Sequence, residues 1–378
     1  MRILQINASY KPAFIYGGPT MSVSMLCEQL VKKNIKVMVF TTTANGPNEL
    51  PVKLNYPVDV DGVQVIYFVR LTKDHTHFSP ALLSKLWSDV KNYDTVHIHA
   101  WWNMVSVLSC LISLMRGVPV IVSPRGTLSP YSFSNKNKFI KNWIHQLLGK
   151  PLLNKCYMHV TSERENTAIS SLVKPKNIIT IPNFVKLPAK TNGVDNTPGI
   201  PIKLLFFSRI EEKKGLDILL NALFKVSVPY HLTIAGNGDI EYINQLKIHA
   251  AQLGIDKHIT WAGFYNEDKF ILLGKHDLFI LPSHDENFAN TVIESLSVGT
   301  AVLISENVGL HDYVAEKKLG WICKTNAESM STYIDDIGNN YQNELLRIRA
   351  TAPAVIYDDF NPDNLVEKYL TMYKQILN

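Results

Sequence analysis

The sequence of 378 residues has few cysteines, few charged residues and no long apolar run. Its four cysteines stand far apart with no CxxC pair, which argues against both a disulfide scaffold and a zinc site. The longest apolar run lies around residues 104–115 and is too short to cross a bilayer. Only 19% of the residues are charged, and the net charge of +5 is too small a bias to indicate nucleic-acid binding.

Two common sequence signatures are also missing. The first ten residues, MRILQINASY, have the pattern of a strand that passes into a polar loop, without the apolar core and cleavage site of a signal peptide. We therefore expect a cytoplasmic protein. The chain has no GxGxxG fingerprint, which disfavours a nicotinamide-dependent enzyme.

Short apolar runs rich in valine, isoleucine and phenylalanine alternate with longer amphipathic stretches. This alternation predicts an α/β fold whose doubly wound parallel sheets are covered by helices on both faces. The chain is longer than one hydrophobic core usually fills, and a segment rich in Pro, Gly, Asn and Lys divides it almost evenly. We predict a first domain over 1–185, a linker over 186–202, a second domain over 203–357 and a last helical segment over 358–378.

A pair of cations marks one predicted strand-to-helix loop of the second half. Arg209 and Lys214 follow the strand-like run LLFFS and precede a leucine-rich helix. Two cations beside a helix N-terminus favour an anion, such as a phosphate. Glu211 and Glu212 lie between them, so two solvated surface cations are an equally good interpretation.

Glycines follow two other predicted strands. Gly236 lies in the segment LTIAGNGD, where a simple turn is the better interpretation. Gly17 and Gly18 come after the first strand and directly before a helix with Pro19 near its first turn. Such a turn lets phosphate oxygens approach backbone amides.

The segment HDENFANTVIESL holds two glutamates, Glu286 and Glu294, separated by seven residues. We expect Glu286 in a loop, Asn290 as the cap of the following helix and Glu294 in its first turn. One acidic residue near a helix start is ordinary, but a second in the preceding loop is not explained by the helix dipole. Carboxylates hold vicinal hydroxyls well, so the pair predicts a site for ribose or a sugar ring.

In this order and spacing, the R-x4-K pair, the AGNG turn and PSHDEN…TVIESLSVGTAVL resemble the retaining nucleotide-sugar glycosyltransferases of family 4. The resemblance extends over essentially the whole chain and includes GGPT near the start. It implies a GT-B fold, with two Rossmann-like domains facing a central cleft and a C-terminal helix that crosses back to the first domain. It also implies a nucleoside-diphosphate sugar as donor, most commonly a UDP-sugar, with no cofactor and no metal.

The resemblance assigns roles to individual residues. Arg209 and Lys214 would stabilise the leaving diphosphate, Glu286 would contact the transferred sugar and Glu294 would bind the ribose. The remaining donor contacts that it implies are Gly17, Gly18, Gly236, Gly263, Phe264, Asn287, Phe288, Ala289 and Asn290. The acceptor would be a saccharide or a lipid-linked saccharide, as in the synthesis of bacterial surface polysaccharides or glycolipids.

One position departs from the family pattern. Members often have a histidine after the strand that here continues as SPRGTLSP, where Arg125 stands instead. An arginine does not deprotonate at neutral pH, so it is no general base, although it can stabilise phosphate charge. His99, at the end of the strand TVHIHA, is the better histidine candidate for a catalytic role, and a packed histidine is the alternative.

Two further patterns have competing interpretations. Asp59-x-Asp61 looks like a metal-binding DxD motif, but Gly62 and the flanking strand patterns favour a hairpin turn. The basic amphipathic stretch 134–153, with Phe139, Trp143 and Leu147 on its apolar side, would suit peripheral contact with an anionic membrane. A domain helix with a solvated lysine face is the favoured alternative.

Two other classes of function compete with glycosyl transfer. A nucleotide-sugar epimerase or oxidoreductase on a similar fold would need an acid–base pair or a dinucleotide fingerprint, and neither is convincing here. A non-catalytic partner that binds a nucleotide sugar would keep the fold while Arg125 replaces the usual histidine.

Overall fold

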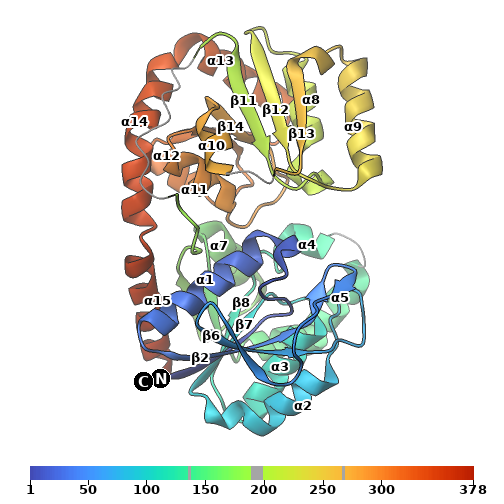
Figure 1. The fold of residues 1–378 in the computed structure, drawn as a ribbon, viewed down its shortest axis with the longest axis vertical. Coiled ribbons are helices and arrows are strands. Elements are labelled where there is room, and N and C mark those ends of the chain that lie inside the picture. The colour runs from blue at the N-terminus through green and yellow to red at the C-terminus, as the bar shows by residue number, and fades with distance from the viewer. Residues whose placement is uncertain (135–137, 189–198, 266–268) are drawn as a thin grey trace. The chain divides into compact units, whose positions relative to one another are not determined.

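A computed structural model describes residues 1–134, 138–188, 199–265 and 269–378. Most of the predicted linker, residues 189–198, lies outside this described part. The chain divides into two compact units, one formed by Met1–Val185 with Pro362–Asn378 and the other by Lys186–Asn361. Each unit contains its own sheet, and each is described by itself below (Figure 1).

The first unit is built on an eight-stranded sheet with the order β10-β9-β8-β7-β1-β2-β6-β5. All neighbouring strands are parallel except β5 and β6. The central strands are almost fully buried, as expected for strands covered by helices on both faces. The strands are β1 (Arg2–Ile6), β2 (Lys36–Thr42), β5 (Pro57–Val60), β6 (Val63–Phe68), β7 (Thr95–His99), β8 (Val120–Ser123), β9 (Tyr157–Val160) and β10 (Asn177–Thr180).

The helices of the first unit cover this sheet from both sides. Strand order runs outward from β1 in both directions, so right-handed crossovers place α1 on one face and α3 on the other. In agreement, α1 packs with α15 while α2 packs with α3. The helices are α1 (Gly18–Lys32), α2 (Pro80–Asp89), α3 (Met104–Met115), α4 (Pro130–Ser134), α5 (Lys138–Ile144), α6 (Lys150–Leu153), α7 (Glu163–Leu172) and α15 (Pro362–Leu377).

The second unit has an entirely parallel six-stranded sheet with the order β13-β12-β11-β14-β15-β16. The order reverses between β11 and β14, which is where doubly wound sheets bind ligands. Its strands are β11 (Ile202–Phe207), β12 (Tyr230–Ala235), β13 (Ile259–Gly263), β14 (Leu278–Leu281), β15 (Ala301–Ser305) and β16 (Gly320–Cys323). Its helices are α8 (Leu216–Leu223), α9 (Ile240–Gln252), α10 (Lys269–Gly274), α11 (Asn290–Ser297), α12 (His311–Glu316), α13 (Ala327–Asn340) and α14 (Gln342–Asp359). Two Rossmann-like units with parallel sheets constitute the predicted GT-B class of fold.

The DxD pattern is a hairpin, as the sequence predicts. Strands β5 and β6 pair antiparallel on either side of Asp61 and Gly62, both of which have positive φ angles. The amide of Gly62 donates to the Asp59 carboxylate at 3.1 Å, which closes the turn. Asp61 forms an ion pair with Lys11 at 2.8 Å. Both carboxylates therefore have roles in holding the turn.

Helix α15 completes the first unit. It begins at Pro362 and buries one face, and Figure 1 shows it beside the sheet that contains the N-terminal strand. Lys33, just after α1, forms ion pairs with two acidic residues of α15, Asp363 and Glu367, at 3.2 and 3.3 Å. The predicted return of the last helix to the first domain is therefore present. Its buried side chains are Leu365, Val366, Tyr369, Leu370, Met372, Tyr373 and Ile376.

The predicted amphipathic stretch 134–153 is interrupted. Helix α5 ends at Ile144, a π-helical turn covers His145–Gly149, and α6 follows. Residues 135–137 and the side chains of Phe139 and Ile140 lie outside the described part. None of the helices in the described residues has the length and apolar character needed to cross a membrane.

Candidate functional site

Two strand-end loops meet at the point where the strand order of the second unit reverses. The loop after β11 carries Lys213 and Lys214, and the loop after β14 carries Asp285 and Glu286. Lys214 forms an ion pair with Glu286, and Lys213 forms one with Asp285 at 2.9 Å. The backbone amide of His284 also donates to the Lys213 carbonyl at 2.9 Å. The structure therefore brings together two of the residues that the sequence predicted for one site.

A glycine allows the two loops to approach each other. Gly215 has a φ of +68°, and a Cβ atom at this position would lie 2.2 Å from the carbonyl oxygen of Pro282. Only glycine tolerates both conditions without displacement of one backbone. Gly215 also precedes α8 directly, so it fixes the position of Lys214 relative to the helix start.

The backbone of Glu286 is fixed as well as its side chain. Its amide donates to the Asn307 carbonyl at 3.0 Å, and its carbonyl accepts from the amide of Gly309 at 2.8 Å. These bonds form an isolated parallel bridge with Val308 after β15. Glu286 is therefore held by loops from three adjacent strands, which restrict its carboxylate to one position.

The start of α11 differs from the prediction. Asn290 is the first residue of the helix and not its cap, because Ala289 occupies the cap position with a left-handed φ of 70°. Glu294 is consequently one residue further into the helix than expected, and no acidic residue lies in the first turn. Glu294 is largely buried and pairs with Lys269 of α10 at 2.7 Å. The sequence analysis missed Lys269 because nothing in its spacing connects it to Glu294.

The residues between the two glutamates contribute in different ways. The side chain of Phe288 is only 2% exposed and packs edge-on against Phe360, so only its backbone can reach a ligand. Asn287 and Asn290 are partly exposed. The left-handed Ala289 is a strained non-glycine residue, of the kind that concentrates at functional sites.

The other predicted donor residues of the second unit follow neighbouring strands at the same edge of the sheet. Arg209 is exposed and pairs with Glu211 at 3.0 Å, which matches the alternative of a solvated cation while leaving it accessible. A Cβ on Gly236 would lie 1.8 Å from the Ser208 carbonyl, so this glycine is required for packing of the AGNG turn. The Gly236 amide donates to the carbonyl of Gly263 at 2.8 Å. Phe264 is 68% exposed directly after it.

In the first unit, the structure connects Arg125 to the start of α1. Gly17 is the cap of α1 and has a φ of 64°, and Gly18 is its first residue. Arg125 follows β8 and has a left-handed φ of 51°. Its Nη1 atom donates to Ser22 Oγ of α1 at 3.1 Å and to Asn183 Oδ1 at 2.6 Å. The predicted glycine turn and the arginine therefore lie at the same carboxyl edge of the first sheet.

His99 is completely buried. Its Nε2 atom bonds to Gln5 at 2.7 Å and its Nδ1 atom accepts from Arg125 at 3.3 Å. Burial lowers the pKa of His99 well below its usual value, with the charges of His97 and Arg125 adding to the effect. This placement corresponds to the alternative of a packed histidine, and the catalytic role of His99 stays a prediction.

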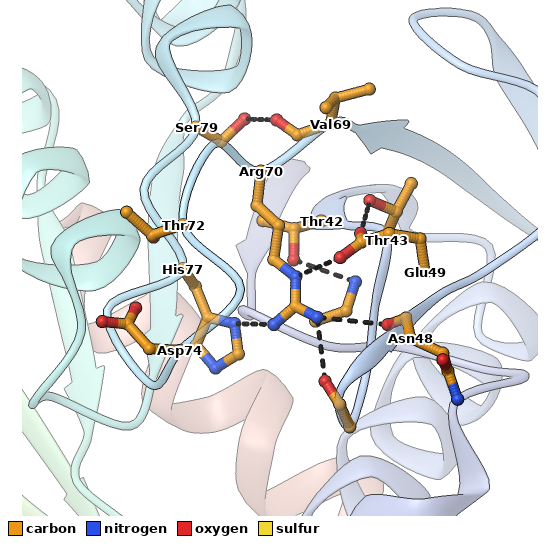
Figure 2. A network of polar contacts seen from close by, with 12 residues as sticks. Thr42, Thr43, Asn48, Glu49, Val69, Arg70, Thr72, Asp74, His77 and Ser79 are labelled. Atoms are coloured by element: carbon orange, nitrogen blue, oxygen red, sulfur yellow. Dashed lines mark hydrogen bonds and ion pairs between the residues drawn. The ribbon is translucent and has the colours of Figure 1, made fainter.

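A second arginine organises loops at this edge. Figure 2 shows Arg70, which is only 4% exposed, at the centre of a polar network that ties Glu49 to His77. Its Nε donates to Glu49 at 2.7 Å, its Nη1 lies 3.2 Å from His77 Nδ1, and its Nη2 donates to the carbonyls of Gly46 and Asn48 at 2.8 and 3.1 Å. Desolvation, followed by the Arg70 charge, lowers the pKa of His77 to about 4. The network joins the short antiparallel pair β3 (Ala44–Asn45) and β4 (Asn48–Glu49), which follows β2, to the loop after β6.

The second unit thus offers a set of groups suited to one kind of chemistry. Lysine and arginine side chains can stabilise an oxyanion as it forms, while carboxylates can accept hydrogen bonds from sugar hydroxyls. The lysine–carboxylate pairing keeps both kinds of group in defined positions. Lys213 and Asp285, which the sequence analysis did not select, belong to the same set, and their adjacency to Lys214 and Glu286 was the available signal.

Comparison with known proteins agrees with this chemistry. A family model described as Glycosyltransferase Family 4 matches residues 16–187, and one described as Glycosyl transferases group 1 matches residues 193–354. Together the two models cover most of the chain, which is a glycosyltransferase similar to those of family 4.

Sequence relatives of this chain include other glycosyltransferases. It is 25% identical over 402 residues to an uncharacterized glycosyltransferase of Methanocaldococcus jannaschii, with 99% of this chain and 98% of the relative covered. It is also 25% identical over 307 residues to the UDP-Gal:α-D-GlcNAc-diphosphoundecaprenol α-1,3-galactosyltransferase of Escherichia coli, which covers 75% of this chain and 76% of that enzyme.

Solved structures share the fold of the glycosyltransferase over its full length. HepE of Anabaena in complex with UDP superposes with a TM-score of 0.76 at 18% identity, covering 99% of this chain and all of that one. Sucrose-phosphate synthase of Thermosynechococcus elongatus superposes with a TM-score of 0.74 at 16% identity, covering 100% and 99%. These similarities establish the GT-B fold.

Proposed function

We propose that this glycosyltransferase moves a sugar from a nucleoside-diphosphate sugar, with UDP as the favoured nucleotide, to an acceptor hydroxyl with retention of configuration and without a metal. The observation that carries the proposal is the Lys214–Glu286 pair at the strand-order reversal of the second sheet. The HepE structure holds UDP, and the Escherichia coli relative is named for a UDP-galactose donor, which supports the choice of nucleotide.

In the proposed reaction, the bond between the anomeric carbon and the diphosphate oxygen breaks as the acceptor oxygen bonds to the same face of that carbon. Negative charge grows on the diphosphate, where Arg209 and Lys214 stabilise it. The acceptor proton passes to the leaving phosphate oxygen, so no protein base is required. Glu286 holds the transferred sugar through its hydroxyls, and Glu294 holds the ribose.

The first test is ligand-dependent thermal stability with UDP, GDP, ADP and NAD, in the presence and absence of EDTA. A ligand at a hundred times its dissociation constant stabilises by about 2.7 kcal/mol. We expect stabilisation by UDP that EDTA does not reduce. Stabilisation by NAD alone would support an oxidoreductase instead, and loss of the UDP effect with EDTA would contradict metal-independent binding.

Two substitutions separate the proposed roles. Glu286→Gln keeps the size of the side chain but removes its charge, so we expect transfer to be abolished with little loss of UDP affinity. Arg209→Ala should weaken both UDP binding and transfer, because the arginine interacts with the diphosphate before and during departure. Calorimetry with UDP measures the nucleotide affinity, and release of UDP from a UDP-sugar measures the rate of transfer. Equal losses from both changes would show that the roles are misassigned.

We also propose that the acceptor belongs to surface polysaccharide or glycolipid synthesis and that the protein contacts the membrane through 134–153. Relatives named for colanic acid and O-antigen synthesis support this pathway class. Trp143 and Leu147 are 69% and 61% exposed, and Ile144 beside them is also exposed. Adjacent exposed apolar side chains next to lysines suit the surface of an anionic bilayer.

Co-sedimentation with vesicles tests this contact. Vesicles containing phosphatidylglycerol should bind the wild-type protein, and neutral phosphatidylcholine vesicles should bind it weakly. The double variant Trp143→Ser/Leu147→Ser should lose the binding while retaining UDP affinity. The matched control is Trp87→Ser, which alters another exposed tryptophan of the same unit. Equal binding by the double variant and the wild type would exclude this contact.

A further inference from the structure

A continuous chain of buried side chains connects Arg125 with helix α15. Arg125 Nε lies 3.3 Å from His99 Nδ1, and His99 Nε2 lies 2.7 Å from Gln5 Oε1. Gln5 Nε2 lies 3.1 Å from the hydroxyl of Tyr373 in α15. From Tyr373 the chain continues to His97 Nδ1 at 2.7 Å, and His97 Nε2 lies 2.6 Å from Ser123 Oγ. Ser123 Oγ in turn lies 2.6 Å from His159 Nδ1. The chain ends where His159 Nε2 meets the Ile181 carbonyl at 2.9 Å.

The guanidinium end determines the direction of the first bonds. Arginine only donates, so His99 Nδ1 accepts and the His99 proton is on Nε2. His99 Nε2 then donates to the oxygen of Gln5, and the Gln5 amide nitrogen donates to the Tyr373 oxygen. Tyr373 must therefore direct its own proton elsewhere, and His97 is its remaining partner.

The other end gives the same answer independently. The Ile181 carbonyl only accepts, so His159 carries its proton on Nε2 and accepts at Nδ1 from Ser123. Ser123 then accepts from His97 Nε2, which leaves His97 Nδ1 to accept from Tyr373. Both ends require Tyr373 to donate to His97, and the Arg125 end also requires it to accept from Gln5, so every bond in the chain is consistent.

This pattern requires three neutral histidines with their protons on Nε2. A proton on any Nδ1 would place two donors against each other. Gln5, His97, His99, Ser123 and His159 are all fully buried, so water cannot replace a broken bond. In agreement, burial lowers the pKa of all three rings, that of His159 to about 3.

The Arg125 end of the chain has no carboxylate in direct contact. Within the described residues, Arg125 forms no ion pair with an Asp or Glu, and the hydrogen bonds of its guanidinium use only Nε and Nη1. Glu165 lies nearby, but its carboxylate accepts from the amides of Gly126 and Thr161 at 2.8 and 2.9 Å. Desolvation lowers the pKa of Arg125, and its backbone is left-handed. A partly buried cation without a carboxylate is costly unless a ligand supplies the negative charge.

We propose that Tyr373, Gln5 and His99 are positioning residues, which hold the Arg125 guanidinium so that Nη2 binds an oxyanion of the substrate. The inference rests on the proposed function, since the oxyanion belongs to the nucleotide-sugar donor of glycosyl transfer. A phosphate oxygen and the carboxylate of an acidic sugar are the two sources with this chemistry. Nη1 is already occupied by Ser22 and Asn183, so the remaining Nη2 makes a single directed contact.

The first experiment measures the chain without any substrate. Nitrogen-15 NMR of histidine-labelled full-length protein reports which ring nitrogen carries the proton. We expect His97, His99 and His159 to be neutral Nε2–H tautomers from pH 5 to pH 8, with each signal assigned by a histidine substitution. A proton on Nδ1 of any of the three, or titration of any of them in this range, would overturn the chain.

The second experiment measures oxyanion binding by calorimetry with UDP, UDP-glucose, UDP-glucuronate and inorganic pyrophosphate. Arg125→Met should weaken binding roughly 10- to 100-fold, the usual effect of a lost hydrogen bond to a charged group. An equal loss for every nucleotide ligand identifies a phosphate as the oxyanion. A loss confined to UDP-glucuronate identifies a sugar carboxylate. Unchanged affinity for all four ligands would overturn the site.

A matched pair of tyrosines on α15 tests the positioning role. Tyr373→Phe removes the hydroxyl in the middle of the chain and should weaken the same binding about fivefold or more. Tyr369→Phe removes an equally buried hydroxyl that lies near Arg125 but bonds to His159 Nε2 at 3.1 Å, outside the segment from Arg125 to Tyr373, and should weaken the binding less than Tyr373→Phe does. Equal effects from the two changes would show a general loss of packing and overturn the proposal.

A double-mutant cycle separates positioning from stability. If Tyr373 acts through Arg125, Tyr373→Phe has no further effect on binding in an Arg125→Met background. An additive effect would overturn the coupling. If the wild-type protein binds none of the nucleotides, the proposed function fails. In that case the inference is tested by two measurements that need no nucleotide: the histidine tautomers by NMR, and the effect of Arg125→Met on pyrophosphate binding.

Discussion

Single residues hold the strand-end loops of the second unit in place, and Gly215 is the clearest case. It allows the loop with Lys214 to pass within van der Waals distance of the Pro282 carbonyl, so the Lys214–Glu286 pair depends on it. The glutamates could be selected from the sequence because carboxylates at an unusual spacing are visible in it. The left-handed Ala289 and the partner Lys269 could not, because they depend on backbone conformation and on packing between distant segments.

Substitution of Gly215 tests this dependence. Gly215→Ala combines an unfavourable positive φ with contact against a backbone carbonyl, and should reduce the free energy of unfolding of the second unit by about 3 kcal/mol. Gly254→Ala is the matched control, since Gly254 has a φ of +70° but nothing within 4 Å of the added Cβ. Gly254→Ala should lower the free energy of unfolding by only ~1 kcal/mol. Urea denaturation measures both, and similar losses would contradict the close approach.

At the scale of elements, the sequence predicted strands better than helix ends. Strands such as 202–207, which is mostly buried, and 278–281, which is fully buried, are largely apolar runs between polar loops, and this pattern depends only on local sequence. The π-helical turn at His145–Gly149 and the chain from Gln5 to His159 were not predictable. Both depend on tertiary contacts, and Gln5 and Tyr373 are 368 residues apart.

The buried face of helix α15 contributes to the stability of the first unit. Leu365→Ala removes a fully buried side chain from its inner face and should destabilise the first unit by about 2–5 kcal/mol. Lys368→Ala, on the exposed face of the same helix, should change stability by less than about 0.5 kcal/mol. Hydrogen exchange of β1 and β7 amides reports the stability of this unit. Unchanged exchange in Leu365→Ala would mean that α15 is dispensable.

At the scale of the whole molecule, buried histidines are distributed unevenly. In the first unit, burial is the main cause of a lowered pKa for five histidines, and in the described part of the second unit only His276 shows a lowered pKa. The five of the first unit are His77, His97, His99, His145 and His159. The two units should therefore respond differently to acid.

The sign of this response follows from proton binding. Below the usual histidine pKa near 6.5, the unfolded chain binds protons that the folded unit does not bind, so stability falls as the pH falls. For His77 the loss extends from about pH 6.5 down to about pH 4, its folded pKa. We expect the first unit to be destabilised more than the second between pH 7 and pH 4.5. Hydrogen exchange resolved by peptide measures this, and equal destabilisation of the two units would contradict it.

The pairing of Gln5 with Tyr373 has a consequence for the order of folding during synthesis. Translation proceeds at about 5–20 residues per second, so Gln5 emerges roughly 20 to 70 seconds before Tyr373 is made. Residues 186–361, which form the second unit, are synthesised before helix α15, the last segment of the first unit. The nascent first unit must therefore carry the unsatisfied polar groups of Gln5 and His97 during that interval. The first unit is therefore the later of the two to reach its native state. It is also the unit with the greater need for shielding by chaperones while translation continues.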